Sequence, residues 1–479
     1  MQSKVYVVIA IMIIGVFTSS AKAPADGLDP QRAAPHGELK GPIVALAWNA
    51  CPVDTKYMSP FIVLSPNGDH PTPQEAAKES LAKPPHRAAL FLPHDLLPKN
   101  DFDHNPADAP AGTPADKRDQ AKNVWYDAAK TEARTRITKY LTEYKAAGGR
   151  LDYLVLDHEG AASIWEISPD ALKTIWNDPR SAAFRKSLSF DKPDGVFDLS
   201  NRQYLEWNAA TWASLAEALD YAVLEPVQQL YPNACVSNFE NYVLTRGNVV
   251  PELNGHMQYM YRKVGTHAAP AFYGAINNLR NISLDGKHPY GDSPFAALRL
   301  DVNRMRAIKR SSSDPVSPWV GYKNMYELKD GAHSVLRSPY YEEELYHIAL
   351  CGATEFLYFN PHPWYAGQDP SEWCDDAQDR LTDACLVELN SHLGNALRSP
   401  ITLEQIAWDS PLVVTGMRIG DKSLWRVTTS PGITKVKVEP SGAILETNGA
   451  VGIWYTAKAN DRPQFTPLVD QQPAAPSAR

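Results

Sequence analysis

Two carboxyl side chains, Asp157 and Glu159, directly follow an apolar run in the segment LDYLVLDHEG, residues 151–160. Side chains two positions apart on a strand point to the same side, so both carboxyls are expected to enter one space while His158 points away. Two carboxyls this close cannot both ionise at low cost, which predicts a raised pKa for one of them. A glutamic acid kept protonated near neutral pH is what general-acid catalysis requires.

The spacing of this pair narrows the chemistry that it can perform. Glycosidases usually place two carboxyls on opposite sides of the scissile bond, which two neighbours on one strand cannot do. The arrangement favours substrate assistance, in which an acetamido group of the substrate attacks the anomeric carbon. Glu240, in SNFENY, is an alternative nucleophile or base. In another alternative, Asp157 and Glu159 have a structural role and cap loops or bind an ion.

The elements that must position these residues follow from apolar runs that alternate with amphipathic stretches. Strands are expected at residues 43–50, 87–96, 151–160, 233–242, 256–263, 270–276, 316–324 and 354–361. Helices are expected at 119–147, 202–230, 293–311 and 340–351. Strands that are apolar almost throughout and alternate with helices are typical of a parallel sheet covered on both faces. Their number predicts an α/β fold with a (β/α) TIM-like barrel, whose catalytic side chains lie at the carboxyl ends of the strands.

Changes in composition divide the chain. An apolar run between Lys4 and the small residues that end at Ala23 is typical of a signal peptide. Near the other end, short apolar runs separated by Gly, Asp and Ser predict antiparallel strands. The expected divisions are a signal peptide at 1–23, a flexible leader at 24–40, the barrel at 41–400, a small C-terminal antiparallel β domain at 401–460 and a disordered tail at 461–479.

The charge balance restricts the class of partner. The formal net charge is −8, and loss of Lys4 and Lys22 with the signal peptide lowers it by two more, to −10. This acidic balance argues against a nucleic acid partner. The N-terminal apolar run is shorter than the roughly 20 residues that a membrane span needs, and no later run is long enough. We therefore expect a soluble exported protein, secreted or periplasmic, with no membrane association after signal cleavage.

No cofactor is implied by the residues that usually bind one. The chain has five cysteines, and no Cys/His spacing among them resembles a zinc site. The expected metal content is therefore none, and no organic cofactor is expected.

Several segments, in the same order along the chain, resemble the hyaluronidases of glycoside hydrolase family fifty-six. PIVALAWNACP resembles that family's first strand, which ends in W-N-A-P, and LDYLVLDHEG resembles its D-W-E strand. Three further runs, MQYMYRKVGTHAAPAFYGAI, DPVSPWVGYKN and IALCGATEFLYFN, resemble its aromatic strand with A-L-Y-P, its P-V-x-x-Y strand and its A-L-G-A-A-G-V-V-L-W-G ending. LDYLVLDHEG also resembles the D-x-x-D-x-D-x-E strand of chitinases. The resemblance covers residues 43–360 and implies a barrel with substrate-assisted chemistry.

The resemblance implies roles for individual residues. Glu159 is expected to be the acid/base, and Asp157 is expected to orient the acetamide. Together with the candidate Glu240, the residues expected to bind substrate are Trp48, Asn49, Phe239, Tyr242, Tyr259, Tyr261, Tyr273 and Tyr358. The chain departs from the family at His158, where D-W-E has Trp, and at Gly160, Ala161 and Ala162, where the family has W-R-P.

The sequence as a whole predicts an exported glycoside hydrolase that cleaves glycans containing 2-acetamido sugars by a retaining mechanism. The departures and the net negative charge favour a carbohydrate polymer or glycoconjugate other than hyaluronan. The alternatives are a glycosidase of different mechanism that uses Glu240 and a non-catalytic carbohydrate-binding barrel.

Overall fold

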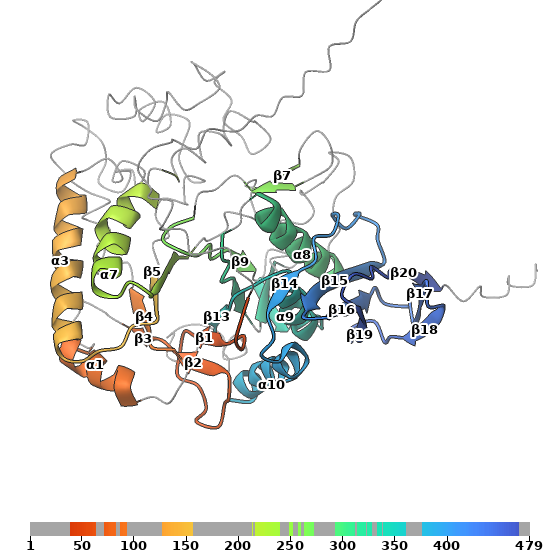
Figure 1. Cartoon of the computed structure of the whole chain (residues 1–479), viewed down its shortest axis with the longest axis horizontal. Helices are drawn as coiled ribbons and strands as arrows, with labels where there is room; N and C mark the ends of the chain where they lie inside the picture. The colour runs from red at the N-terminus through yellow and green to blue at the C-terminus, as the bar shows by residue number, and fades with distance from the viewer. Residues whose placement is uncertain are drawn as a thin grey trace, which may run out of the picture.

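The computed structural model describes most of the chain between Leu39 and Leu468. The described residues are 39–63, 71–82, 87–92, 127–156, 213, 216–239, 249–251, 257–259, 263–272, 293–311, 314–321, 323–327, 333–337, 339–360 and 376–468. The predicted signal peptide, residues 1–23, lies outside this set. Short parallel strands occupy the middle of the described part, with helices beside them and antiparallel strands at one end (Figure 1).

Five strands form one parallel sheet in the order β2-β1-β13-β10-β9. Their bounds are Ala45–Ala47 (β1), Met58–Pro60 (β2), Ala271–Phe272 (β9), Trp319–Gly321 (β10) and Phe356–Phe359 (β13). Strand β1 pairs with both β2 and β13, and Leu46 lies opposite Ser59 and Leu357. Strand β13 is the last of these five strands in the sequence, so its pairing with β1 brings the first and the last of them side by side.

Four strands form a second parallel sheet in the order β3-β4-β5-β6. Their bounds are Ile62–Val63 (β3), Ala89–Leu92 (β4), Tyr153–Leu156 (β5) and Cys235–Asn238 (β6). Only Phe61 separates β2 from β3, so one extended segment contributes an edge to both sheets. No strand is expected there from sequence, because Pro60 interrupts the apolar run.

The remaining two edge strands are β6 and β9, and hydrogen bonds join β6 to the segment before β9 although no ladder joins the two strands. The backbone amides of Thr266 and His267 both donate to the carbonyl oxygen of Val236, at 2.7 and 3.1 Å. A parallel bridge between Ala268 and Val316 then continues the pairing from β9 toward β10. The described residues therefore show an α/β arrangement of parallel sheets, and the ladders themselves do not close it into a barrel.

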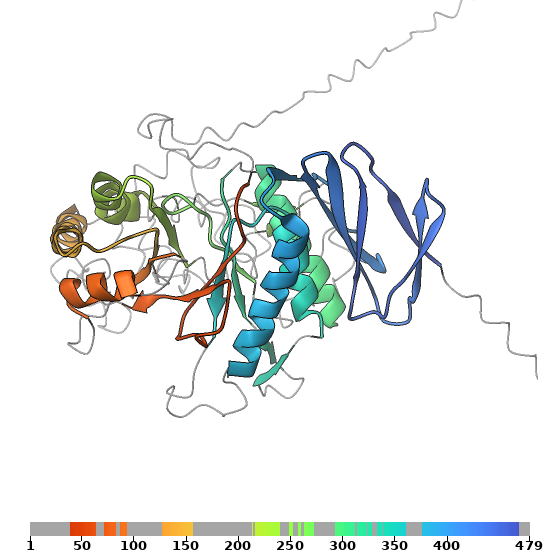
Figure 2. The same cartoon turned by 60° about the horizontal axis from the view of Figure 1, so that its bottom comes forward.

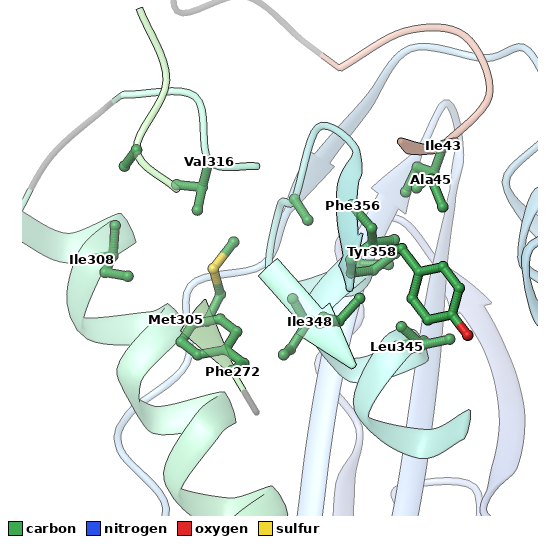
Figure 3. Close-up of a cluster of buried hydrophobic side chains, with 14 of the residues drawn as sticks. Ile43, Ala45, Phe272, Met305, Ile308, Val316, Leu345, Ile348, Phe356 and Tyr358 are labelled. Carbon is green, nitrogen blue, oxygen red and sulfur yellow. The ribbon is translucent and has the colours of Figure 1, made fainter. Parts of the chain in front are cut away.

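Alternate residues of the parallel strands belong to two separate buried clusters, as expected for strands covered on both faces. The inner cluster is Val44, Leu46, Phe61, Ala89, Phe91, Tyr153, Val155, Phe239, Ala269, Ala271, Trp319 and Leu357. The outer cluster contains the intervening residues together with apolar helix faces. Figure 3 shows part of it, where Phe356 and Tyr358 lie beside Leu345 and Ile348.

Helices cover the outer faces of the strands (Figures 1 and 2). Their bounds are Pro73–Ala82 (α1), Asp127–Ala146 (α3), Glu225–Leu230 (α7), Pro294–Ser311 (α8), Tyr341–Leu350 (α9) and Asp376–Leu393 (α10). A π-helical segment, Asp220–Leu224, leads into α7. Helices α1, α3 and α7 lie on the side of the second sheet, and α8, α9 and α10 lie on the side of the first.

Helix α10 holds β1 and β2 in place through buried polar side chains. Asn390 accepts a hydrogen bond from the backbone amide of Ile43 and donates one to its carbonyl oxygen, both at 2.8 Å. One to two turns earlier, Asp383 accepts bonds from the amides of Lys56 and Tyr57, just before β2. The apolar pattern does not predict this helix because its buried face is partly polar. Its polar residues replace the hydrogen bonds that these strand ends would otherwise make with water.

The C-terminal strands form an antiparallel β domain (Figure 2). Its two sheets have the orders β14-β15-β16-β19 and β18-β17-β20. The bounds are Arg398–Pro400 (β14), Leu412–Ile419 (β15), Lys422–Thr429 (β16), Lys435–Glu439 (β17), Ala443–Glu446 (β18), Ile453–Lys458 (β19) and Gln464–Leu468 (β20). The antiparallel architecture predicted for this region is therefore present.

Strand β20 lies where a disordered tail is expected. Phe465 packs against Trp425 and Tyr455, with ring centroids 6.0 and 5.7 Å apart. Strand β17 supplies the backbone partners for β20. The composition of the tail does not reveal these long-range contacts, so the expectation of disorder from residue 461 is wrong up to Leu468.

A buried polar seam joins this β domain to α9. The Glu343 carboxylate accepts hydrogen bonds from Nε and Nη2 of Arg426, from the Thr428 hydroxyl and from the Gly452 amide. One turn along α9, His347 lies between threonine hydroxyls of β15 and β16, at 2.8 and 2.9 Å. The β domain thus shares its buried polar groups with the helices that cover the first sheet.

The expected strand at 256–263 is not part of the parallel sheets. Met257–Tyr259 forms β8, which pairs antiparallel with β7 (Val249–Pro251). A second hairpin pairs β11 (Lys323–Glu327) with β12 (His333–Arg337). Polar Gln258 interrupts the apolar run, which suits a hairpin better than a strand buried on both faces. Among the helices of the described residues, none has the length and apolar character needed to cross a bilayer.

Candidate active site

The sequence predicts its catalytic residues immediately after β5. This strand ends at Leu156, and Asp157 and Glu159 follow it directly in the chain. Several predicted site residues lie outside the described part of the structure; these are Asp157, Glu159, Glu240, Tyr242, Tyr261 and Tyr273, and of Tyr259 only the backbone is described. The structure therefore describes the strands that lead to the predicted site and the rings between them.

Six aromatic side chains meet between the parallel strands and are here called the aromatic cluster: Trp48, Phe61, Phe91, Phe239, Trp319 and Phe359. The Trp48 ring centroid lies 4.4 Å from that of Phe91 and 5.5 Å from that of Phe359. The rings of Phe239 and Trp319 meet edge to face at 5.4 Å. Such edge-to-face and tilted pairs are favourable because the positive edge of one ring meets the negative face of another.

The aromatic cluster has a buried and a half-buried side. Trp319 is fully buried, whereas Trp48 and Phe359 are half-buried, and both of these follow or end their strands at the carboxyl side. The exposed part of the cluster therefore lies at the end of the strands where catalytic residues are expected. Apolar ring surface at this place can pack against the C–H faces of a sugar.

Two predicted substrate-binding residues, Trp48 and Phe239, belong to the aromatic cluster. Its other four members, Phe61, Phe91, Trp319 and Phe359, are not among the predicted site residues. Alternation along the strands would have found two of them, because Phe91 and Phe359 stand two positions after the inner residues Ala89 and Leu357.

Tyr358 faces away from the aromatic cluster. Its side chain is fully buried in the outer cluster, and Figure 3 shows it beside Leu345 of α9. Its neighbours Leu357 and Phe359 face the inner side instead. Tyr358 was expected on the inner face, but its two neighbours in the strand occupy that face. An all-apolar strand such as FLYF does not indicate which of its two faces is inside.

Asn49 is engaged with the end of the neighbouring strand. Its backbone amide donates to Oδ1 of Asn360 at 2.8 Å, and its side-chain Nδ2 donates to the carbonyl oxygen of Asn360 at 2.6 Å. The side-chain amide of Asn360 in turn contacts both carboxylate oxygens of Asp379, at 3.3 Å each. Asn49 was expected to bind substrate, and the bonds seen here connect the carboxyl ends of β1 and β13.

The opposite, amino-terminal ends of the strands are filled by a charged cluster. Glu355, just before β13, is fully buried and forms an ion pair with Arg87, just before β4. Its carboxylate also accepts hydrogen bonds from the hydroxyls of Ser317 and Thr354. His267 Nε2 lies 3.9 Å from the same carboxylate. In barrel enzymes this end serves stability and the carboxyl end serves catalysis.

Burial and charge act in opposite directions on these groups. Burial by itself would raise the pKa of Glu355, but Arg87, His267 and the two hydroxyls outweigh it and hold that pKa below the ordinary value. Burial lowers the pKa of His267 to about 4, so its imidazole is neutral at physiological pH. Burial, followed by the Glu355 charge, raises the pKa of the Cys235 thiol to about 12. The cluster therefore holds one ion pair among neutral groups.

A metal centre and a cavity are two kinds of site that the described residues could form. Within the described ranges, no group of three or more His, Cys, Asp or Glu side chains is placed to hold a metal ion. A cavity of about 280 Å³ lies near the amino-terminal ends, against Arg87, Ser80 and Met58. A second, of about 790 Å³, lies along the seam between α9, α10 and β19, against Glu388 and Trp454.

Comparisons with known proteins give structural matches only. No protein-family model matches the chain, and no curated protein matches it. Among solved structures, a GH36 alpha-galactosidase from Geobacillus stearothermophilus in complex with raffinose matches with a TM-score of 0.38 and 11% identity, over 90% of this chain and 56% of that one. The catalytic domain of GH30 xylanase C from Talaromyces cellulolyticus matches with a TM-score of 0.34 and 8% identity, over 90% and 98%.

A beta-galactosidase from Halorubrum lacusprofundi also matches, with a TM-score of 0.33 and 14% identity over 57% of this chain and 43% of that one. The chain spans about half the length of the first alpha-galactosidases that it matches. Nothing in these matches supports the hyaluronidase family specifically. TM-scores below 0.5 do not establish a common fold, so the architecture rests on the strand pairing described above.

Proposed function

We propose that this chain is a glycoside hydrolase with Glu159 as its acid/base and Asp157 as its acetamide-orienting residue. The substrate is a glycan containing 2-acetamido sugars, and the mechanism is retaining and substrate-assisted. Export, as the N-terminal pattern of residues 1–23 predicts, is part of the proposal.

The observation that carries the proposal is the alternation along β5. Tyr153 and Val155 belong to the inner cluster, and Asp157 and Glu159 are the next two positions of the same series in the sequence. Glu240 belongs to the other series: it directly follows the inner residue Phe239. This favours the Asp157–Glu159 pair over the alternative that uses Glu240.

The proposal includes closure of the parallel strands into a barrel. Two features support it: the shared edge at Phe61 and the hydrogen bonds from Thr266 and His267 to Val236. In a barrel, inner side chains of all strands converge, and the carboxyl ends surround one mouth. The half-buried rings of Trp48 and Phe359 would then lie at the base of that mouth.

The proposed chemistry depends on two carboxyls, Asp157 and Glu159, next to an apolar surface of aromatic rings. Low polarity and the neighbouring Asp157 keep Glu159 protonated, so that it can donate a proton to the departing glycosidic oxygen. As the bond from this oxygen to the anomeric carbon breaks, the acetamide oxygen of the substrate attacks that carbon and forms a cyclic oxazolinium. The Asp157 carboxylate accepts a hydrogen bond from the N–H of the acetamide and so stabilises the positive charge that develops on its nitrogen. Glu159, now a carboxylate, takes a proton from water, which opens the ring and restores the original anomeric configuration.

The decisive experiment compares Glu159→Gln, Asp157→Asn and Glu240→Gln on a glycan panel. Loss of the acid/base should lower kcat by roughly 10²–10⁴-fold. Asp157→Asn should be nearly as severe, and Glu240→Gln should retain activity. A thiazoline mimic of the cyclic intermediate should inhibit the wild type, and NMR of the first product should show retained configuration.

Other outcomes would reject the proposal in distinct ways. Full activity in Glu159→Gln would remove the acid/base assignment. Loss of activity in Glu240→Gln, with cleavage of sugars that lack an acetamide, would identify the second mechanism. Glycan binding without turnover by the wild type would identify a non-catalytic binding protein.

A further inference from the structure

We propose that Asn360 is a positioning residue that fixes the Trp48–Phe359 ring pair as the sugar-contacting surface. The inference rests on the proposed function for its consequence in catalysis. Its structural part rests on five described residues, Asn49, Asn360, Asp379 and the ring-bearing Trp48 and Phe359, and is independent of the reaction. The contacts among Asn49, Asn360 and Asp379 are here called the asparagine clamp.

Two residues of the asparagine clamp are buried, and the orientation of the Asn360 side-chain amide is determined by its neighbours. Asn360 and Asp379 are both fully buried, 311 and 330 residues respectively after Asn49 in the chain. The Asp379 carboxylate only accepts hydrogen bonds when ionised, so the side-chain NH₂ group of Asn360 must face it. Oδ1 of Asn360 is thereby turned toward the backbone amide of Asn49. An ionised carboxylate at position 360 would have no donor for Asp379.

The clamp adjoins the two half-buried rings along the chain. Trp48 precedes Asn49, and Phe359 precedes Asn360, so each asparagine of the clamp is bonded covalently to one ring-bearing residue. The strand pairing between β1 and β13 continues only as far as the bond from the Trp48 amide to the Tyr358 carbonyl, at 2.9 Å. Beyond that point, the bonds of Asn49 to Asn360 hold the two strand ends together. They therefore set the 5.5 Å edge-to-face arrangement of the Trp48 and Phe359 rings.

The chain offers a matched control at the other end of the same strand. Asn390 is also buried, lies on α10 like Asp379, and makes two hydrogen bonds to the backbone of Ile43. Its replacement removes the same chemistry from the amino-terminal side of β1, away from the rings. A purely structural role predicts similar effects for the two asparagines, whereas a positioning role predicts an effect on the rings from Asn360 alone.

The test compares Asn360→Ala with Asn390→Ala at a temperature well below the melting point of both. Asn360→Ala should raise KM for the glycan about tenfold with a smaller change in kcat, and Asn390→Ala should change KM less than twofold. In a Trp48→Ala background, Asn360→Ala should have no further effect on KM, since interacting residues are not additive. Equal KM changes in the two asparagine variants, or additivity with Trp48→Ala, would overturn the inference.

A second readout works without turnover. The near-ultraviolet circular dichroism of Trp48 is defined by subtracting the spectrum of Trp48→Phe from that of the wild type. Asn360→Ala should lose this signal and Asn390→Ala should keep it; retention in Asn360→Ala would overturn the clamp. A wild type inactive on every glycan would reject the proposed function, while this spectrum would still decide the clamp. If Asn360→Ala does not fold, Asn49→Ala removes one bond only and should weaken the signal in the same direction.

Discussion

Arg304 shows how individual charged residues are accommodated inside this protein. It is buried on α8, donates to Asp301 at 2.6 Å and to the carbonyl oxygen of Ala271 at 3.0 Å, and lies over the Phe272 ring at 4.8 Å. One guanidinium thus fixes the end of β9, just before the predicted substrate residue Tyr273. A second buried carboxyl, Glu344 on α9, approaches the same Arg304–Asp301 pair.

Glu344 is expected to reduce stability at neutral and higher pH. Burial, followed by the Asp301 charge, raises its pKa well above the ordinary 4.5. A carboxyl with a raised folded-state pKa stabilises the folded protein in its protonated form. This contribution to the free energy of unfolding is complete below pH 4.5 and is lost as the pH rises through the folded-state pKa. The loss is up to about 1.4 kcal/mol per pH unit. Glu344→Gln cannot ionise, so it should be more stable than the wild type at pH 8 and no more stable at pH 4.

Urea denaturation followed by circular dichroism at pH 4, 6 and 8 measures this effect. Asp301→Asn is the matched comparison, because it removes a partner from a buried cation. It should cost about 3–5 kcal/mol at neutral pH. A constant difference between Glu344→Gln and the wild type at all three pH values would show that Glu344 does not titrate as described.

At the scale of elements, each parallel strand has different tasks at its two ends. The carboxyl ends of β1 and β13 carry half-buried rings, and the amino-terminal ends of β4 and β13 are joined by the pair of Arg87 and Glu355. The ion pair spans the two sheets, since β4 belongs to one and β13 to the other. A substitution in this pair should therefore affect stability and leave the chemistry at the other end unchanged.

Arg87→Met should lower the free energy of unfolding at pH 7 by about 2–3 kcal/mol. This is less than the 3–5 kcal/mol typical of fully buried pairs, because the Arg87 side chain is 36% exposed. Glu355 has a lowered folded-state pKa, so the stability it provides is present above pH 4.5 and is lost as the pH falls. The deficit of Arg87→Met should accordingly shrink toward pH 4.

Chemical denaturation between pH 4 and pH 7 measures the loss of stability, and kcat/KM at low temperature shows whether the chemistry at the other end of the strands is unchanged. The double variant Arg87→Met with Glu355→Gln should recover part of the lost stability, since it leaves no unpaired charge. A tenfold loss of kcat/KM in a folded Arg87→Met protein would contradict the division of tasks between the strand ends.

At the scale of the whole molecule, the β domain and the parallel sheets are expected to unfold together. The seam around Glu343 and Arg426 is buried, and Asn303 of α8 donates a hydrogen bond to the Ile406 carbonyl oxygen and accepts one from the Ile406 amide. Gly452 allows the closest approach: a Cβ there would lie 2.6 Å from the Glu343 carboxylate. These contacts support bracing as the role of the β domain.

Gly452→Ala should destabilise the entire chain by about 1–3 kcal/mol through overpacking at this seam. Val451→Ala is the neighbouring control, because Val451 is 54% exposed and its truncation should be nearly neutral. Tryptophan fluorescence and far-ultraviolet circular dichroism should report one common transition in each protein. Two separate transitions in Gly452→Ala, with only the β domain affected, would show that the domains unfold independently.

Several features of this protein follow from local sequence. Long apolar runs alternate with amphipathic stretches, and this local pattern is sufficient to predict parallel strands and most helices. The place of Asp157 and Glu159 directly after the run that forms β5 is likewise local information. The short, regularly punctuated runs after residue 400 predict the antiparallel domain for the same reason.

Other features depend on contacts between distant residues. The face of β13 that carries Phe359 inward and Tyr358 outward is set by pairing with β1 and β10 and by packing against α9. The partner of Asn49 lies 311 residues away, and β20 exists only because β17 and Trp425 contact it. Local propensity acts over a few residues, whereas strand register, the inward face and a buried hydrogen-bond partner are decided by the free energy of the assembled core. Only the tertiary structure could decide them.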